Sequence, residues 1–317
     1  MTRGDLMSAF RHPERSEGSP ANDVRCADRG RSLAALGMTD AVQLDLSFER
    51  AGARTVLARR HVGYPFNVTA PLQTDGSGAD VIVQSVSGGI YGGERLGQHL
   101  NAGRGAQAVI RLPSATVVHA ARNGAGAYQS VALHAADGAS LSYLPRPLIL
   151  FPGSVFMQAM EITVAESATV LIRDGFLLHD PQTMASGARD LRSHLIVRKM
   201  TGSLIAMDRM RIDDGMVDAA SPGVTNAFRA FGAVWLIRRV DAEQCRAIKT
   251  AIAHLFDGNG DCYVSTTSLR NDGGTAVRVA AMDGGALDAA LDATVGTLQT
   301  IAGCLSRPEG SVAVVTI

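Results

Sequence analysis

A nine-residue segment recurs three times in the first half of the chain, and this repeat restricts the fold more than any other feature. The copies are Leu100–Ala108, Leu133–Leu141 and Ile162–Val170, which start 33 and 29 residues apart. Each copy joins a strand-like run, a turn of small residues with an Ala at a fixed place, and a second strand-like run. Repeats at this spacing are typical of strands stacked in layers. The sequence therefore predicts a β-solenoid or a two-layer β-sandwich, with an ordinary β-meander as the alternative.

Helices are expected only towards the C-terminus. Asp241 and Gln244 form a capping-box pattern before an apolar stripe that ends at Asp257 and Gly258. The stripe consists of Ile248, Ile252, Leu255 and Phe256. Two strands at 263–269 and 276–281 are separated by a hairpin signal. A last helix is expected to carry the apolar residues Leu287, Leu291, Val295, Leu298 and Ile301.

The chain is thus predicted to be mainly β with some α structure. We expect a stacked β-helix-like or β-sandwich-like body over residues 41–221, and a small α+β part over residues 222–317 that packs on this body. Residues 1–40 are polar and lack a sustained period, so the sequence predicts disorder there. We expect the folded protein to begin between Met38 and Val42, downstream of a translation start that is assigned too early.

Charge and hydropathy exclude two classes of partner. The 30 basic residues equal the 30 acidic residues, and no polybasic run is present. A nucleic-acid-binding protein normally presents a basic surface to displace counterions, so we expect no nucleic acid partner. No apolar run is long enough to span a membrane. The four cysteines form no C-x-x-C pair, which favours reduced thiols in the cytoplasm.

The glycine-rich element at 87–96 is the most conspicuous motif. It contains Gly88, Gly89, Gly92 and Gly93, and Glu94 follows where a phosphate-binding loop needs Lys. A carboxylate at this position would repel phosphate. The glycines therefore indicate a bulge or tight corner between strands, with a conformational role.

No catalytic constellation is recognisable in the sequence. The histidines do not occur in the H-x-H or H-E-x-x-H spacings of strong metal sites. There is no G-x-S-x-G elbow and no recognisable pair of catalytic carboxylates. Asp174 and His179, with Asp180 beside it, are the nearest approach to a metal-binding group.

Two long stretches resemble the urease accessory protein D family, called H in some bacteria. They are SGGIYGGERLGQHLNAGRGAQAVIRLPSATVVHAA and LSYLPRPLILFPGSVFMQAMEITVAESATVLIRDGFLLH, followed by LIAMDRMRI and a helix–strand region. The resemblance covers roughly residues 42–305. The chain departs from the family pattern at several positions. Glu94 replaces the usual Asp, Arg146 replaces the usual Gln, and Arg173–Asp174 replaces a Trp–Glu pair.

The resemblance implies a scaffold rather than an enzyme. Members of the family bind the urease apoprotein subunits and, with accessory proteins F and G, promote nickel insertion, so we expect a metallochaperone-type maturation factor. An internal tunnel would carry nickel in transit, without a stably bound cofactor. The ligands that we expect along this path are Glu94, Asp174 and His179, because nickel accepts carboxylate and imidazole ligands.

Two other functions stay open at this point. A β-solenoid enzyme acting on polysaccharide would need clustered acids on adjacent rungs, whereas Asp137 and Glu166 of the repeats fall in turns. A metal-free protein-interaction module is the second alternative.

Overall fold

The structure is a computed structural model that describes residues 42–73, 78–180, 188–213 and 225–303. These residues belong to a unit that spans Thr39–Ile317. The segment predicted to be disordered, residues 1–40, lies outside the described residues. The boundary predicted between residues 221 and 222 lies outside them as well, so it stays a prediction.

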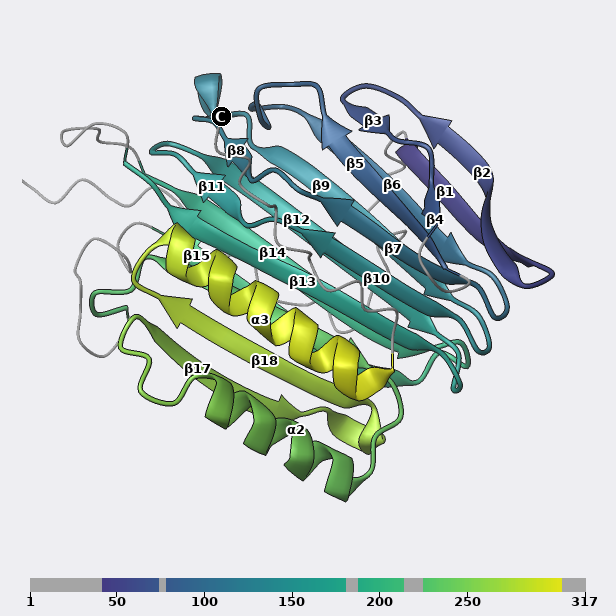
Figure 1. Cartoon of the computed structure of the whole chain (residues 1–317). Helices are drawn as coiled ribbons and strands as arrows, with labels where there is room; N and C mark the ends of the chain where they lie inside the picture. Colours follow the sequence, from purple (N-terminus) through teal and green to yellow (C-terminus); the bar gives the residue numbers. More distant parts are fainter. Residues whose placement is uncertain (1–41, 74–77, 181–187, 214–224, 304–317) are drawn as a thin grey trace, which may run out of the picture. The chain divides into compact units, whose positions relative to one another are not determined.

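Two β-sheets account for most of the described chain (Figure 1). The strands of the seven-stranded sheet are β1 (Val42–Ala51), β2 (Arg54–Val62), β6 (Arg95–Ala102), β9 (Ala127–Ala135), β12 (Val155–Val164), β14 (Asp190–Lys199) and β15 (Leu204–Asp213). Their order across the sheet is β15-β14-β12-β9-β6-β1-β2. Between β2 and β14 the chain leaves this sheet after each strand and returns to it later, whereas β1–β2 and β14–β15 are consecutive antiparallel pairs.

The strands of the eleven-stranded sheet are β3 (Phe66–Val68), β4 (Leu72–Gln73), β5 (Ala79–Ser85), β7 (Gln107–Leu112), β8 (Thr116–Val118), β10 (Ser140–Pro145), β11 (Leu148–Leu150), β13 (Thr169–Leu178), β16 (Ala230–Ile237), β17 (Cys262–Ser268) and β18 (Gly274–Ala281). The main path runs β17-β18-β16-β13-β10-β7-β5-β3. The pairs β5–β7, β7–β10 and β10–β13 are parallel, and β13–β16, β16–β18 and β17–β18 are antiparallel.

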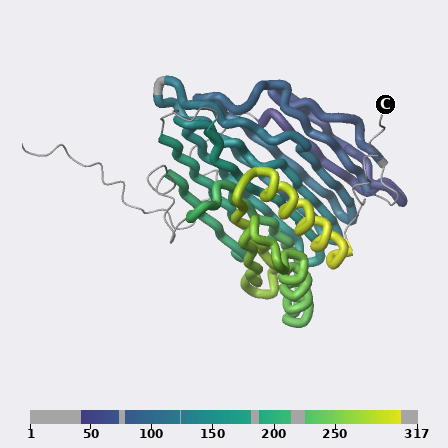
Figure 2. The backbone as a smooth tube through the Cα atoms, turned by 60° about the vertical axis from the view of Figure 1, so that its left-hand side comes forward, coloured from purple at the N-terminus to yellow at the C-terminus, as the bar shows by residue number. Residues whose placement is uncertain are grey.

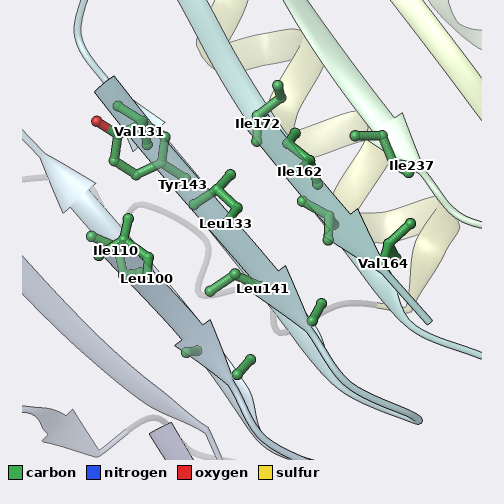
Figure 3. Close-up of a cluster of buried hydrophobic side chains, with 14 of the residues drawn as sticks. Leu100, Ile110, Val131, Leu133, Leu141, Tyr143, Ile162, Val164, Ile172 and Ile237 are labelled. Carbon is green, nitrogen blue, oxygen red and sulfur yellow. The ribbon is translucent and has the colours of Figure 1, made fainter. Parts of the chain in front are cut away.

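The sequence repeat is the rung of a solenoid-like stack, as predicted. Each copy spans the end of one strand in the seven-stranded sheet, a corner, and the start of one strand in the eleven-stranded sheet. Leu133 is in register with Leu100 on one side and with Ile162 on the other. Their side chains lie in a row between the two sheets (Figure 3). Equivalent positions of the repeat are therefore direct neighbours in space.

Small residues at the corners allow successive rungs to approach closely. Gly105 and Gly138 adopt φ angles of 65° and 67°, which glycine reaches without steric cost. The Gly105 N–H donates to the Asp137 carbonyl at 2.9 Å, and the Ser140 N–H donates to the Ala106 carbonyl at 2.9 Å. These hydrogen bonds connect one corner to the next.

The C-terminal part continues the eleven-stranded sheet and covers its outer face. The described α-helices, α2 (Ala242–Leu255) and α3 (Gly284–Ala302), lie on the same side of the strands (Figures 1 and 2). The predicted capping box of Asp241 and Gln244 is present at the start of α2. Two short 3-10 helices, η2 (Arg122–Gly124) and η3 (Arg270–Asp272), complete the description, and η3 connects β17 to β18 as a hairpin.

Two apolar residues expected to face the core are instead exposed. Leu255 and Ile301 each expose about two fifths of their surface, at 41%. Both lie in the last turn of their helix, where the next residues, Phe256 and Ala302, pack against the apolar cluster in their place. None of the described helices is long and apolar enough to cross a membrane.

The largest apolar cluster fills the space between the two sheets. It contains the fully buried Leu44, Phe48, Leu100, Leu141 and Ile162, among others. A second cluster lies between the eleven-stranded sheet and the helices, where Ile248, Leu287 and Leu291 pack against Val234 and Leu171. Burial of each such side chain stabilises the fold by about 1.5–3 kcal/mol.

Candidate functional site

The apolar filling between the sheets is interrupted by a cavity of about 300 Å³. Strands of both sheets line it. Its polar lining includes Gln158, Ser193 and Asp208 from the seven-stranded sheet, and Asp174, Ser265 and Arg278 from the eleven-stranded sheet. Met160, Phe176 and Trp235 supply apolar surface. Such a mixed lining, mostly apolar with a few converging polar groups, is typical of a ligand site.

Two further cavities extend from this one through the space between the sheets. A small cavity of about 30 Å³ shares Gln158, Met160 and Asp174 with the first. A cavity of about 210 Å³ shares Leu112, Ser114, Thr116 and Gln129 with the small one, and reaches Gly88 and Gly89. Because neighbouring cavities share lining residues, the three form a line from the glycine-rich element to β17 and β18.

Asp174 on β13 lies where the first two cavities meet. Its Oδ1 accepts a hydrogen bond of 2.9 Å from the Gly175 N–H. Burial raises the pKa of Asp174, a hydrogen bond from Gln158 and the one from Gly175 oppose this shift, and the negative charge of Asp208 adds to it. No basic side chain of the described residues forms an ion pair with Asp174. A carboxylate held in this way gains from the arrival of a cation.

Side chains whose neutral oxygen atoms could bind a cation continue from Asp174 along the seven-stranded sheet. Gln129 and Gln158 are cross-strand neighbours, and Ser193 follows Gln158 in the same row. Gln98 is buried and accepts a hydrogen bond from the Tyr143 hydroxyl at 3.2 Å, while burial raises the pKa of Tyr143. This glutamine row escaped the sequence analysis. A signal was present, since Gln129 and Gln158 each stand four positions before the equivalent residues Leu133 and Ile162 of the repeat.

The glycine-rich element lies close against the next rung at the far end of the line of cavities. A Cβ on Gly89 would approach the Val117 carbonyl oxygen to 2.4 Å, and one on Gly92 would approach the Ala125 carbonyl oxygen to 2.5 Å. Gly89 and Gly93 also have φ angles of 140° and 87°. Glycine is therefore required here for both contact and conformation, whereas a Cβ on Gly88 would meet only the Tyr91 hydroxyl at 3.0 Å.

Replacing Gly89 with Ala is expected to destabilise the protein by about 2–3 kcal/mol, because the backbone strain adds to the clash with β8. Equilibrium unfolding in urea measures this loss. Gly88→Ala is the matched control, since the Tyr91 side chain can move, and it should cost well under half as much. Equal losses in the two variants would show that close packing at Gly89 does not matter.

The three metal ligands expected from the sequence lie in different surroundings. Only Asp174 lines the cavities. Glu94 folds back on its own loop, where a carboxylate oxygen accepts a hydrogen bond of 3.0 Å from the Tyr91 N–H. His179 is exposed at the end of β13, with its ring 5.6 Å from that of Phe151. Over the described ranges, no group of three or more His, Cys, Asp or Glu side chains is arranged to hold a metal ion.

The comparisons with known proteins bear on what such a line of cavities is for. The model of the UreD urease accessory protein family matches residues 40–309. That match spans both sheets and both described helices. The chain belongs to the UreD family of urease accessory proteins.

Individual relatives agree with the UreD family model. The chain is 36% identical over 265 residues to urease accessory protein UreD 2 of Bradyrhizobium sp. strain ORS 278, covering 83% of this chain and 91% of the relative. It is 36% identical over 264 residues to UreD 2 of Bradyrhizobium sp. strain BTAi1, covering 82% and 90%. Urease accessory protein UreD 1 of Pseudomonas syringae pv. syringae is 34% identical over 250 residues, covering 78% and 87%. The family resemblance inferred from the two long stretches is confirmed.

Proposed function

We propose that this chain is a non-catalytic maturation factor that binds the urease apoprotein together with accessory proteins F and G in the cytoplasm. Nickel, the cargo, passes through the line of cavities between the two sheets on its way to urease. Membership of the UreD family supports the first part of this proposal. The second part depends on the chemistry of the cavities.

The position of Asp174 is the single observation that supports the proposed nickel path most directly. It is a half-buried carboxyl group that lines both the large and the small cavity, and burial is the largest cause of its raised pKa. A dication at this point compensates the charge of the carboxylate, which burial and Asp208 disfavour. The neutral oxygens of Gln158 and Gln129 extend the path on either side of this charge.

Weak ligands suit a path better than a tight site does. Nickel accepts oxygen and nitrogen ligands, and a complete set of them would hold the ion instead of passing it on. The large cavity provides the carboxylates of Asp174 and Asp208 and the imidazole of His194, and the small cavity provides Asp174 alone, with amide and hydroxyl oxygens beside them. This arrangement favours transit over storage. A polysaccharide-acting enzyme is disfavoured, because Glu166 lies in a corner, pairs with Lys199 at 2.7 Å and lines only a small cavity of about 20 Å³.

Asp174→Asn tests the nickel path. We expect urease activation to fall at least about tenfold, the lower end of the loss seen when a residue that supports a metal site is changed, while the complex with the apoprotein still assembles. Urease activity after co-expression measures the first effect, and co-purification measures the second. Glu166→Gln is the matched control, because this carboxylate lines none of the three cavities of the path. Full activation by Asp174→Asn would refute the path, and failure of the wild-type chain to co-purify would refute the scaffold role.

The same variant has an expected effect on stability. Because the pKa of Asp174 is raised above its ordinary value of 3.8, the native state binds more protons than the unfolded state between the ordinary and the raised pKa. The contribution of Asp174 to stability is therefore greatest at low pH and falls as pH rises through this window. Asp174→Asn removes the fall, so we expect it to be about 1 kcal/mol more stable than wild type near neutral pH. Urea unfolding at about pH 4 and about pH 7 measures the difference, and a variant less stable at the higher pH contradicts it.

A further inference from the structure

An ion pair joins the two sheets across the large cavity. Nη2 of Arg278 on β18 lies 2.7 Å from Oδ1 of Asp208 on β15. The two strands belong to different sheets, so this contact is a cross-link between the layers. Both side chains also line the cavity.

The pair lies where the cavity opens to solvent. Tyr263 beside it is 67% exposed, and the side chains of Arg278 and Asp208 are 51% and 28% exposed. The opposite lining is closed, since Gln158 is only 5% exposed. We call Asp208, Tyr263 and Arg278 the mouth of the cavity.

The pair at the mouth can open at little cost. A half-exposed ion pair gains little net stability, because water solvates both charges when they separate and salt screens their attraction. Arg278 also has a second partner, since its guanidinium carbon lies 5.5 Å from the centre of the Trp235 ring. A cation–π contact can retain the guanidinium beside the mouth after it leaves Asp208. Two alternative partners for one cation make an exchange feasible.

The charges in the cavity favour such an exchange. Asp174 inside and Asp208 at the mouth are both acidic. Arg278 pairs with Asp208, and His194 is the other basic side chain of the described lining. The negative charge of Asp208 disfavours ionisation of Asp174, so a further positive charge in the cavity is stabilising. A divalent cation near Asp208 supplies this charge and competes directly with the guanidinium.

We propose that Asp208 is an exchangeable cation site at the mouth, held by Arg278 in the cation-free protein and opened when a divalent metal ion displaces that guanidinium. The proposal rests on the proposed function, because it takes nickel as the cation that uses the mouth. In this proposal Arg278 has a positioning role, because its guanidinium occupies the place of the metal ion beside Asp208. The Trp235 ring contacts the guanidinium after the metal ion has displaced it.

Fluorescence of the isolated full chain tests the exchange. Trp235 is the only tryptophan of the sequence, so tryptophan emission reports on the environment next to Arg278. Titration with Zn²⁺, a probe that does not quench as Ni²⁺ does, should shift the wild-type emission maximum saturably, and calorimetry with Ni²⁺ should show binding of the cargo itself. Arg278→Gln removes the competing cation, so we expect about fivefold tighter binding and no shift on titration. Asp208→Asn should lose both the shift and the binding at this site.

Two controls distinguish the exchange from a general effect. Arg211→Gln removes an exposed arginine from β15, the strand that also holds Asp208, and should behave as wild type. About 1 M NaCl screens the ion pair and should shift the wild-type emission without any metal, but not that of Arg278→Gln. Unchanged affinity in Arg278→Gln, or an unaltered wild-type shift in Asp208→Asn, would overturn the proposal.

The outcomes separate this proposal from the proposed function. If the fluorescence and affinity changes occur as expected but the chain fails to promote urease activation, the site stands and the nickel path fails. If Asp174→Asn abolishes activation while Zn²⁺ and Ni²⁺ leave the wild-type signals unchanged, the nickel path stands and the exchange at Asp208 fails.

Discussion

Removing the Asp292 carboxylate by Asp292→Ala is expected to cost about 3–5 kcal/mol of stability, because it leaves a buried arginine without a counter-ion. Asp292 on α3 binds Nη1 of Arg173 through one oxygen and Nη1 of Arg146 through the other, the latter at 2.6 Å. Arg173 is the arginine that would be left buried and unpaired, since only 6% of its side chain is exposed. Chemical unfolding monitored by circular dichroism measures the loss.

The two arginines respond differently to this cluster. Burial lowers the pKa of Arg173, and the charge of Asp292 opposes that effect. For Arg146, burial also lowers the pKa, but its bonds to Asp288 and Asp292 raise the value overall. Both guanidinium groups remain charged at neutral pH, so neither can avoid the cost of a missing partner by losing its proton.

Two further variants test the reason for this loss of stability, one as a control and one that should restore stability. Asp288 binds only Arg146 in this cluster, at 2.5 Å, and it is 35% exposed, so Asp288→Ala should cost about 1 kcal/mol or less. The double variant Arg173→Met with Asp292→Leu removes both charges and should recover most of the loss. A single Asp292→Ala variant as stable as Asp288→Ala would show that the cluster does not anchor α3 to the sheet.

Leu133→Ala is expected to destabilise the protein by about 2–5 kcal/mol. Leu133 is 2% exposed and lies in the middle rung, in register with Leu100 and Ile162. The sheets on both sides are rigidly hydrogen-bonded, so the space left by the missing methyl groups cannot close easily. The unfolding transition in urea gives the difference in free energy.

The neighbouring residue on the same strand is the control for Leu133→Ala. His134 points to the opposite face of the seven-stranded sheet, because successive side chains of a strand alternate. His134→Ala should therefore change stability by only about 0.5 kcal/mol. If the two variants lose similar stability, the row of Leu100, Leu133 and Ile162 is not a central part of the core.

Local features of the sequence predicted much of the fold. The repeat predicted the stacked layers, because copies in equivalent positions hydrogen-bond to one another. The capping box at Asp241 predicted the start of α2, since a cap involves only a few consecutive residues. The exposed positions of Leu255 and Ile301 could not be read from periodicity, because a periodic pattern shows which residues share a face but not which of them the opposite surface contacts.

The candidate site was less accessible to sequence reasoning. Asp174 was identified, but its relation to Gln158 and Asp208 depends on strands that are distant in the sequence and face each other across the core. The expected grouping of Asp174 with Glu94 and His179 came from residue type alone. Chemistry at a single position does not show whether side chains from different rungs point into the same space.

The sequence by itself determined the stacked β architecture, the positions of the helices and the family, because these depend on local patterns and on the order of motifs. Only the tertiary structure decided what the charged departures from the family pattern do. Arg146 and Arg173 lie 27 residues apart in the sequence, yet both bind Asp292 on α3, and Arg278 meets Asp208 across the two sheets. The physical reason is that an ion pair depends on distances set by the packing of sheets and helices, and no period or spacing along the chain records those distances.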